Sequence, residues 1–270
     1  MNGPIRVLVT RSGRDGRALA ERLGAGPLSV SHYAPVALHG PSDPDAVRRE
    51  LQTLLPADCL VAPSAEALRQ LVKLVAPNRL ARTPVVVPGR GTARVAAALG
   101  FDRVHAPDRD GTSERMLDLP ILRSVAGLRV LILAAAGGRR LIQQTLAQRG
   151  AEVHRVHVYR RLPAPAPAEL LATLAATDEL VTLLASGGAL DGLREQLSAA
   201  AWRTLTAGLV IAPSSRVADL ARAAGCRHTV AAAGADDASM LAALGRARPE
   251  LWPMRYSVES EVESKGQGEP

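Results

Sequence analysis

The chain has 270 residues, of which 47% are hydrophobic and only 2% are aromatic. This length suits two domains of ordinary size, and Leu, Val and Ala must fill their cores. The formal net charge of +7 favours nucleic acid, an acidic membrane or a polyanionic small molecule as partner. Because the arginines are scattered rather than run together, they favour a lined cleft over a basic tail. The shortage of aromatic side chains argues against stacking of single-stranded bases, so we expect no nucleic-acid partner.

The sequence also gives no sign of a membrane span or a metal site. No run approaches the ~20 apolar residues that a span needs, and the charged first strand is unlike a signal peptide. We therefore expect a cytoplasmic protein without a membrane partner. Cys59 and Cys226 lack the spacing of a zinc site or a disulfide framework, which predicts two small buried thiols. The six histidines lack metal-ligand spacing, so no metal is expected.

Short apolar runs alternate along the chain with stretches rich in Ala, Leu and Arg. The runs have the length and composition of buried parallel strands, and the stretches between them suit helices. This alternation predicts an α/β fold with parallel sheets covered on both faces. The predicted strands are 5–9, 59–62, 85–87, 130–133, 180–184 and 209–212, and the predicted helices are 17–23, 45–55, 65–75, 92–99, 139–149, 190–197 and 215–224.

Capping residues mark the ends of several predicted helices. Asp43 and Pro44 suit an N-cap and the first helical position. Gly100, Gly150 and Gly225 each follow a helix, where a C-cap glycine is expected.

Two longer extended segments interrupt the alternation. Residues 29–38 and 152–162 carry polar side chains on alternate positions, and spaced prolines stiffen the chain after the second segment. We interpret these segments as the two crossings between domains. Residues 253–270 contain four glutamates and little hydrophobicity, which predicts a disordered acidic tail.

Three landmarks recur in the same order about 123 residues further along the chain. Arg6-Val-Leu-Val9 returns as Arg129-Val-Leu-Ile132, and Ser64-Ala-Glu-Ala-Leu68 returns as Ser186-Gly-Gly-Ala-Leu190. The loop ending at Thr92 has its counterpart in the loop ending at Ser215. The pattern indicates duplicated α/β units, and we expect a ligand to bind in the cleft that two such units would form.

The loop after the third predicted strand opens a helix with Gly89-Arg-Gly-Thr-Ala-Arg94. It resembles the start of a dinucleotide fingerprint, but Arg94 occupies the third glycine position and no strand-ending acid follows at the required distance. The loop still offers bare backbone N–H groups at Gly89 and the hydroxyl of Thr92. At a helix N-terminus these groups suit any anion, including a carboxylate.

Two further strand-to-helix turns combine small residues with arginine. Thr10 and Arg11 follow the first strand, and Arg139 stands at the equivalent turn of the second repeat. Ligands gather at this edge of open α/β sheets, and the planar donor fork of arginine matches a carboxylate. The alternative is that each arginine only solvates the start of a helix.

Serines stand where several predicted strands lead into helices. Ser64, Ser186 and Ser215 hold such positions, without a GxSxG elbow or a paired base, which argues against nucleophilic catalysis. Ser214 and these three serines also suit helix N-caps.

Tyr159 is one of three tyrosines and is followed by Arg160 and Arg161. A phenol can donate a proton or a hydrogen bond to a departing hydroxyl. The alternative is a ring packed at a hinge with its hydroxyl in water.

Taken together, these motifs resemble the uroporphyrinogen-III synthase family over about residues 5 to 245. No single motif is specific, but their order and spacing are. They are Thr10-Arg11, Ser64, Gly89-x-x-Thr92-Ala93, Gly138-Arg139, Leu146-x-x-x-Gly150-Ala-Glu-Val153, Val158-Tyr159-Arg160-Arg161, Ser186 and Pro213-x-Ser215.

The resemblance implies two flavodoxin-like, parallel-sheet α/β domains, pseudo-duplicated and joined by a two-stranded connection. It implies one domain built from residues 1–34 plus 162–252 and another from residues 37–158. The first strand and helix of each repeat would join the other repeat's sheet, an exchange that periodicity alone does not predict.

The resemblance also implies a cyclising lyase. Such an enzyme converts the linear tetrapyrrole hydroxymethylbilane to uroporphyrinogen III, with loss of water and inversion of ring D, on the way to haem or sirohaem. It implies no cofactor, a monomer, and a substrate that hydroxymethylbilane synthase could hand over. Tyr159 matches the family's tyrosine proposed to assist departure of the hydroxyl. The expected substrate-binding residues are Thr10, Arg11, Ser64, Gly89, Thr92, Arg139, Ser186 and Ser215.

Two alternatives to an active lyase remain at this point. One is a non-catalytic relative that binds a tetrapyrrole or another polyanion for regulation. The other is a two-domain protein that binds a sugar or a nucleotide.

Overall fold

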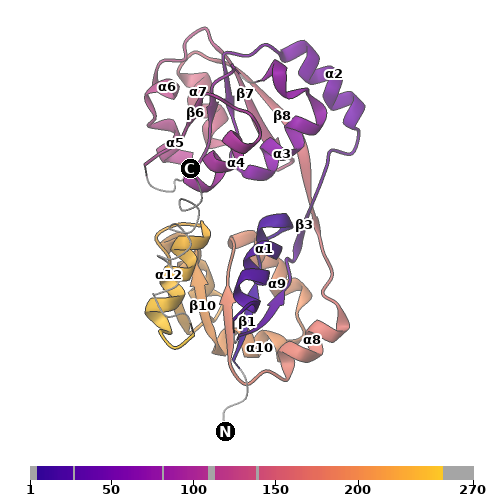
Figure 1. The fold of residues 1–270 in the computed structure, drawn as a ribbon, viewed down its shortest axis with the longest axis vertical. Helices are drawn as coiled ribbons and strands as arrows, with labels where there is room; N and C mark the ends of the chain where they lie inside the picture. The colour runs from indigo at the N-terminus through magenta and orange to yellow at the C-terminus, as the bar shows by residue number, and fades with distance from the viewer. Residues whose placement is uncertain (1–4, 27, 81, 109–112, 138–139, 252–270) are drawn as a thin grey trace, which may run out of the picture. The chain divides into compact units, whose positions relative to one another are not determined.

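The computed structural model describes residues 5–26, 28–80, 82–108, 113–137 and 140–251. The chain divides into two compact units (Figure 1), which we call unit 1 (Met1–Ala37 with Pro163–Pro270) and unit 2 (Leu38–Leu162). The chain passes between the units within β3 (Val36–His39) and β8 (Glu152–Pro163), which are neighbours in one sheet.

Unit 1 is built on a parallel sheet with the strand order β11-β10-β9-β1-β2. Its strands are β1 (Arg6–Val9), β2 (Ser29–His32), β9 (Leu180–Leu183), β10 (Leu209–Ala212) and β11 (His228–Ala231). Alternate side chains point to opposite faces of a strand, so Val7 and Val9 belong to one core and Leu8 to another.

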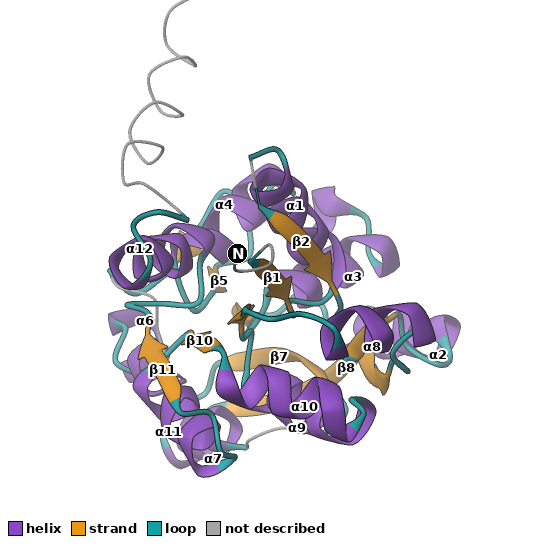
Figure 2. Ribbon diagram, turned by 90° about the horizontal axis from the view of Figure 1, so that it is seen from below, coloured by secondary structure: helices purple, strands orange, loops and turns teal. Residues whose placement is uncertain are grey.

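Helices cover both faces of this sheet, as Figure 2 shows for α1 and α12 on one side and α10 on the other. The helices on the Val7 side are α1 (Gly13–Gly24) and α12 (Asp237–Ala247). Those on the Leu8 side are α8 (Ala168–Ala175), α9 (Gly187–Gln196), α10 (Ala199–Ala207) and α11 (Ser215–Ala223).

Unit 2 contains a sheet with the strand order β3-β8-β7-β4-β5-β6. The further strands are β4 (Cys59–Val61), β5 (Val85–Val86), β6 (Val104–His105) and β7 (Arg129–Ala135). One face is covered by α2 (Pro44–Leu54), α3 (Ala65–Leu74) and α4 (Arg90–Ala98), the other by α5 (Ser113–Leu117), α6 (Pro120–Arg123) and α7 (Leu141–Gln148), and a short 3₁₀ helix, η1 (Pro77–Arg79), follows α3.

The two sheets repeat one topology. Numbered by their position in each sequence repeat, where β7 and β8 correspond to β1 and β2, the strands of both sheets follow the order 2-1-3-4-5 of flavodoxin-like folds, with β3 added at one edge of unit 2. β1 pairs with β9, and β7 pairs with β4, so each sequence repeat gives its first strand to the other repeat's sheet. Figure 1 shows the result in unit 1, where indigo β1 and α1 lie among orange elements. The predicted duplication and α/β class are confirmed.

The predicted elements lie close to the observed ones, and the capping predictions are confirmed. The Asp43 carboxylate accepts a hydrogen bond from the Ala46 amide at 2.8 Å, and Pro44 is the first residue of α2. Gly100, Gly150 and Gly225 follow α4, α7 and α11 with φ of 86°, 85° and 98°.

One predicted element is wrong in its extent. Residues 29–38 do not form a single extended segment, because β2 ends at His32 and β3 starts at Val36 in a different sheet. Pro35 lies in the break, and proline cannot donate to a sheet hydrogen-bond ladder. The predicted tail, 253–270, lies outside the described residues. None of the described helices has both the length and the apolar character of a membrane span.

Candidate active site

In flavodoxin-like sheets, ligands bind at the carboxyl ends of the strands, beside the point where the strand order reverses. In unit 1 that point lies between β1 and β9, and in unit 2 between β7 and β4. The carboxyl ends of the parallel strands of each sheet, with the residues that follow them, define one carboxyl edge in each unit. Most predicted site residues fall there.

Thr10 joins the two central strands at the carboxyl edge of unit 1. Its hydroxyl donates to the Leu183 carbonyl at 3.0 Å and accepts from the Ala185 amide at 2.9 Å. The residue is 1% exposed. The geometry therefore favours a positioning role for Thr10, and its predicted contact with a ligand stays a prediction.

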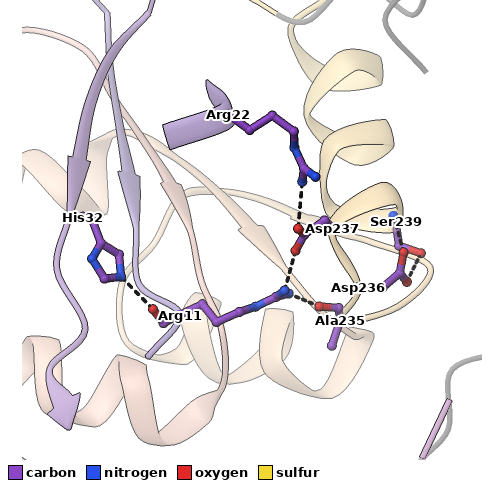
Figure 3. Close-up of polar contacts among 7 residues, drawn as sticks. All are labelled: Arg11, Arg22, His32, Ala235, Asp236, Asp237 and Ser239. Atoms are coloured by element: carbon purple, nitrogen blue, oxygen red, sulfur yellow. Dashed lines mark hydrogen bonds and ion pairs between the residues drawn. The ribbon is translucent and has the colours of Figure 1, made fainter. Parts of the chain in front are cut away.

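The Arg11 side chain is hydrogen-bonded to the start of α12 (Figure 3). Its guanidinium pairs with the Asp237 carboxylate and donates to the Ala235 carbonyl. Arg22 donates to the other oxygen of Asp237 at 2.7 Å. Asp237 lies in the first turn of α12, where the helix dipole favours a negative charge. The carboxylate of Asp236, the N-cap of α12, lies next to Asp237, so the cluster sets two arginines against two carboxylates.

The turn between β1 and α1 is closely packed around Gly16. A Cβ atom on Gly16 would lie 1.7 Å from the Arg11 carbonyl oxygen and 2.7 Å from Nε2 of His32. His32 Nε2 lies 2.8 Å from the same carbonyl oxygen and donates to it, as Figure 3 shows. Only glycine fits this approach, which sets the backbone of Arg11.

The predicted serines of unit 1 lie at helix N-termini on the same edge. Ser186 is the N-cap of α9, and its hydroxyl accepts from the Ala189 amide at 3.1 Å. Ser214, rather than Ser215, is the N-cap of α11, and Ser215 is the first helical residue. The capping role is confirmed for Ser186 and Ser214, while substrate binding by Ser186 and Ser215 stays a prediction.

In unit 2, the predicted anion-binding loop stands at the start of α4. Gly89 is the buried N-cap of that helix, and Thr92 is half-buried in its first turn. Arg139 lies outside the described residues, so its predicted role stays a prediction. The turn before it is held by Arg155 of β8, which donates to the carbonyl of Gly137.

Ser64 and Tyr159 meet at the carboxyl edge of unit 2. Ser64 is the N-cap of α3 and accepts from the Ala67 amide at 3.3 Å. Its hydroxyl lies 3.3 Å from the Tyr159 hydroxyl, which also accepts a 3.0 Å hydrogen bond from Arg161. Tyr159 as a whole residue is 3% exposed, and its ring packs in the core of unit 2. Its predicted catalytic role stays a prediction.

A β-bulge in β8 sets the direction of Tyr159. Ala134 pairs with His157, but Ala135 pairs with Tyr159, so β8 has one extra residue. Without it, alternation would send Val158 and Tyr159 to opposite faces. With it, both side chains join the same core as Leu133. Bulges often re-aim side chains next to active sites.

Three features of the site escaped the sequence predictions. These are the contact of Arg161 with Tyr159, the anchoring of Arg11 by Asp237 and the packing constraint on Gly16. The spacing of Tyr159 and Arg161 carries a signal for the first, because residues two apart on a strand share a face. The other two depend on long-range contacts.

A metal site requires a cluster of metal-binding side chains. Among the described residues, no group of three or more His, Cys, Asp or Glu side chains could hold a metal ion. Both cysteines are free and buried, as predicted. Burial, followed by the Asp58 carboxylate, raises the pKa of the Cys59 thiol to about 12.

The fold and the candidate site together define the class of protein. It is an α/β protein of two units whose parallel sheets present helix N-termini and arginines at their carboxyl edges. A family model described as "Uroporphyrinogen-III synthase HemD" matches residues 16–242. The chain therefore belongs to the uroporphyrinogen-III synthase family, which consists of cyclising lyases of tetrapyrrole biosynthesis.

Individual relatives agree with this membership. The chain is 33% identical to uroporphyrinogen-III synthase of Salmonella typhimurium over 249 residues, which cover 88% of this chain and 99% of the relative. It is 31% identical to the enzyme of Escherichia coli K12 over 245 residues, with the same coverage of 88% and 99%.

Solved structures show the same fold. A mutant uroporphyrinogen III synthase from the extremely thermophilic bacterium Thermus thermophilus matches with a TM-score of 0.58 and 23% identity, covering 91% of this chain and 98% of that one. The enzyme of Helicobacter pylori 26695 matches with a TM-score of 0.60 and 14% identity, covering 91% and 100%.

Proposed function

We propose that this chain cyclises hydroxymethylbilane to uroporphyrinogen III, with loss of water and inversion of ring D. Family membership over most of the chain supports the reaction class. The observation that carries the proposal at the residue level is the Tyr159 hydroxyl, held by Ser64 and Arg161 at the carboxyl edge of unit 2.

The substrate carries eight carboxylates, and the chain offers anion-binding groups at both carboxyl edges. Helix N-termini bind anions through free N–H groups and the helix dipole, and arginine forks match carboxylates. One pair of opposite charges 4 Å apart gains only ~1 kcal/mol in water. Many such contacts together would hold the flexible substrate curled, which is mainly an orientation effect. The residues that we propose for binding are Arg11, Ser64, Gly89, Thr92, Arg139, Ser186 and Ser215, with Thr10 positioning the strands.

The chemical step requires departure of the terminal hydroxyl. A proton from the Tyr159 phenol would let it leave as water, and a cationic azafulvene remains that closes through a spiro intermediate. Cyclisation without inversion proceeds unaided, so the main task of the protein is to steer the ends of the substrate. The reaction needs no cofactor in this scheme.

The proposal also covers the domain division, the cellular location, the oligomeric state and the source of the substrate. We assign the two units as separate domains, close to the predicted ranges 1–34 plus 162–252 and 37–158. The chain acts as a cytoplasmic monomer and receives its substrate from hydroxymethylbilane synthase.

Incubation of the purified chain with hydroxymethylbilane, followed by oxidation and separation of the porphyrin isomers, tests the function. We expect the type III isomer to form faster than the type I isomer forms in buffer alone. Type I product at the uncatalysed rate would refute the proposal and favour the non-catalytic tetrapyrrole-binding relative.

A further inference from the structure

We propose that Arg161 is a positioning residue for Tyr159, which it keeps oriented as a proton donor and stabilises once the proton has left. The inference rests on the proposed function, because it names how the phenol at that site acts. It is carried by the contacts of the two side chains.

Arg161 contacts both the hydroxyl and the ring of the tyrosine. Nη2 of Arg161 donates to the phenol oxygen at 3.0 Å, and the guanidinium carbon lies 5.6 Å from the ring centroid, within the range of a cation–π contact. The ring is buried in the core of unit 2, whereas Arg161 is exposed. Fixing the ring from its solvent side is therefore the role that the geometry gives to Arg161.

The local geometry of β8 brings this pair together. Tyr159 and Arg161 are two residues apart on β8, so their side chains leave the same face. The bulge before Tyr159 turns that face toward Ser64 at the start of α3. Arg160 points to the other face, where its Nε donates to the Gly40 carbonyl at 3.1 Å.

Hydrogen-bond chemistry limits the directions in which the Tyr159 phenol proton can point. A guanidinium can only donate, so the phenol oxygen is the acceptor in its contact with Arg161. The phenol proton must then point either at Ser64 or toward a ligand. Ser64 already accepts from the Ala67 amide, and it can take the phenol proton in a hydrogen bond or donate its own. In both arrangements the phenol keeps a proton that it can give away.

The proton moves from the phenol to the leaving oxygen and later returns. The carbon–oxygen bond of the substrate breaks, its electron pair stays with the oxygen, and the phenol proton completes a water molecule. The substrate becomes a cationic azafulvene and Tyr159 a phenolate, which Arg161 and the Ser64 hydroxyl stabilise as preorganised donors. Ring closure releases a proton from the attacked pyrrole, and the phenolate takes it back.

A competing role for Arg161 is direct binding of a substrate carboxylate. That role would weaken substrate binding whether or not residue 159 carries a hydroxyl. Positioning of the phenol, in contrast, can matter only while the hydroxyl is present. A double-mutant cycle separates the two roles.

The experiment measures kcat and KM for four proteins: the unmodified chain, Arg161→Met, Tyr159→Phe and the double variant. We expect Arg161→Met to lower kcat about tenfold or more, the typical factor for a charge-assisted hydrogen bond. In the Tyr159→Phe background the same substitution should have little further effect on kcat. Arg160→Met removes the same charge one residue away and should not reproduce the loss in kcat.

An equal loss of kcat in both backgrounds, or a change confined to KM, would overturn the inference. A second readout, the same cycle measured by urea unfolding, needs no substrate. Coupling between residues 159 and 161 in unfolding supports their contact even if the chain makes no type III isomer, so a failed function and a failed contact are distinguishable. Absence of coupling in unfolding would contradict the contact itself.

Discussion

Two buried threonines in unit 1 have opposite hydrogen-bonding situations. Thr10 and Thr182 are each 1% exposed and lie on neighbouring strands or at their ends. The Thr10 hydroxyl makes two hydrogen bonds. The Thr182 hydroxyl has no partner among the residues that the structure describes. A buried polar group without a partner lowers the stability of the folded state.

Thr182→Val should therefore stabilise the protein. Valine keeps the branched shape and removes the unsatisfied hydroxyl, which we expect to raise the free energy of unfolding by ~1 kcal/mol. Thr10→Val is the matched control and should lower it by ~1–3 kcal/mol, because it leaves the Ala185 amide without its partner. Urea unfolding measures both, and a destabilised Thr182→Val variant would contradict the hydrogen-bond assignment.

Because the pKa of the buried Cys59 thiol is raised, we expect the protein to lose stability at alkaline pH. Its pKa is raised to about 12 in the folded protein, against ~8.5 for an unfolded thiol. Below pH ~8.5 both states hold the proton and the contribution to stability is complete. As the pH rises toward 12, the unfolded state releases the proton first and the contribution is lost. The free energy of unfolding of Cys59→Ala should therefore fall less steeply between about pH 8 and 10 than that of the unmodified chain. Equal slopes in the two proteins would contradict a raised thiol pKa in the folded state.

At the scale of elements, the β1–α1 turn is the most constrained segment of the carboxyl edge in unit 1. Gly16→Ala would press a methyl group onto the Arg11 carbonyl, so we expect a loss of ~3 kcal/mol or more in unfolding free energy. Gly24→Ala in the same helix is the control, because its Cβ would meet only Val30 at 3.9 Å. Thermal unfolding compares the two, and equal midpoints would contradict the packing.

Periodicity and capping were sufficient to predict most of the helices and strands. Predicted strand 209–212 coincides with β10, and predicted helix 65–75 ends one residue beyond α3. β6 was missed because Val104 stands between Arg103 and His105, whereas β5, which is equally short, lies in the apolar run 85–87. α12 was also missed, although Asp236 at its N-cap and the spacing of Met240 and Leu244 could have indicated it.

The candidate site was only partly predictable. Ser64 and Tyr159 were named from the sequence, yet their contact depends on a bulge that adds one residue to β8. Strand periodicity assumes a regular ladder, so it cannot anticipate that shift of face. Arg11 was named as well, but its partner Asp237 is far away in the sequence.

At the scale of the whole molecule, the sequence repeats and the compact units do not coincide. The exchange of first strands means that each unit draws on both repeats. Each unit nevertheless has its own core, since the core clusters around Leu60 and Val61 lie within unit 2 and those around Leu8 and Val7 within unit 1. Folding should follow the units rather than the repeats.

Expression of fragments tests this point. Residues 38–162 form a continuous segment that contains β4 to β7 and all but the end residues of β3 and β8, and we expect them to unfold cooperatively in urea. Residues 1–128, one full sequence repeat, lack β7 to β11 and should not fold alone. Cooperative unfolding of the second fragment but not the first would contradict the division into units.

The central claim is that the reaction is carried out at the carboxyl edge of unit 2, by the phenol of Tyr159. The most direct measurement is the fraction of type III isomer made from hydroxymethylbilane by the unmodified chain and by Tyr159→Phe at equal concentration. We predict mostly type III product from the unmodified chain. The variant should stay folded but turn over roughly a hundredfold more slowly, the lower range for loss of an acid catalyst, so that type I product takes over. Undiminished type III formation by a folded Tyr159→Phe variant would contradict the account.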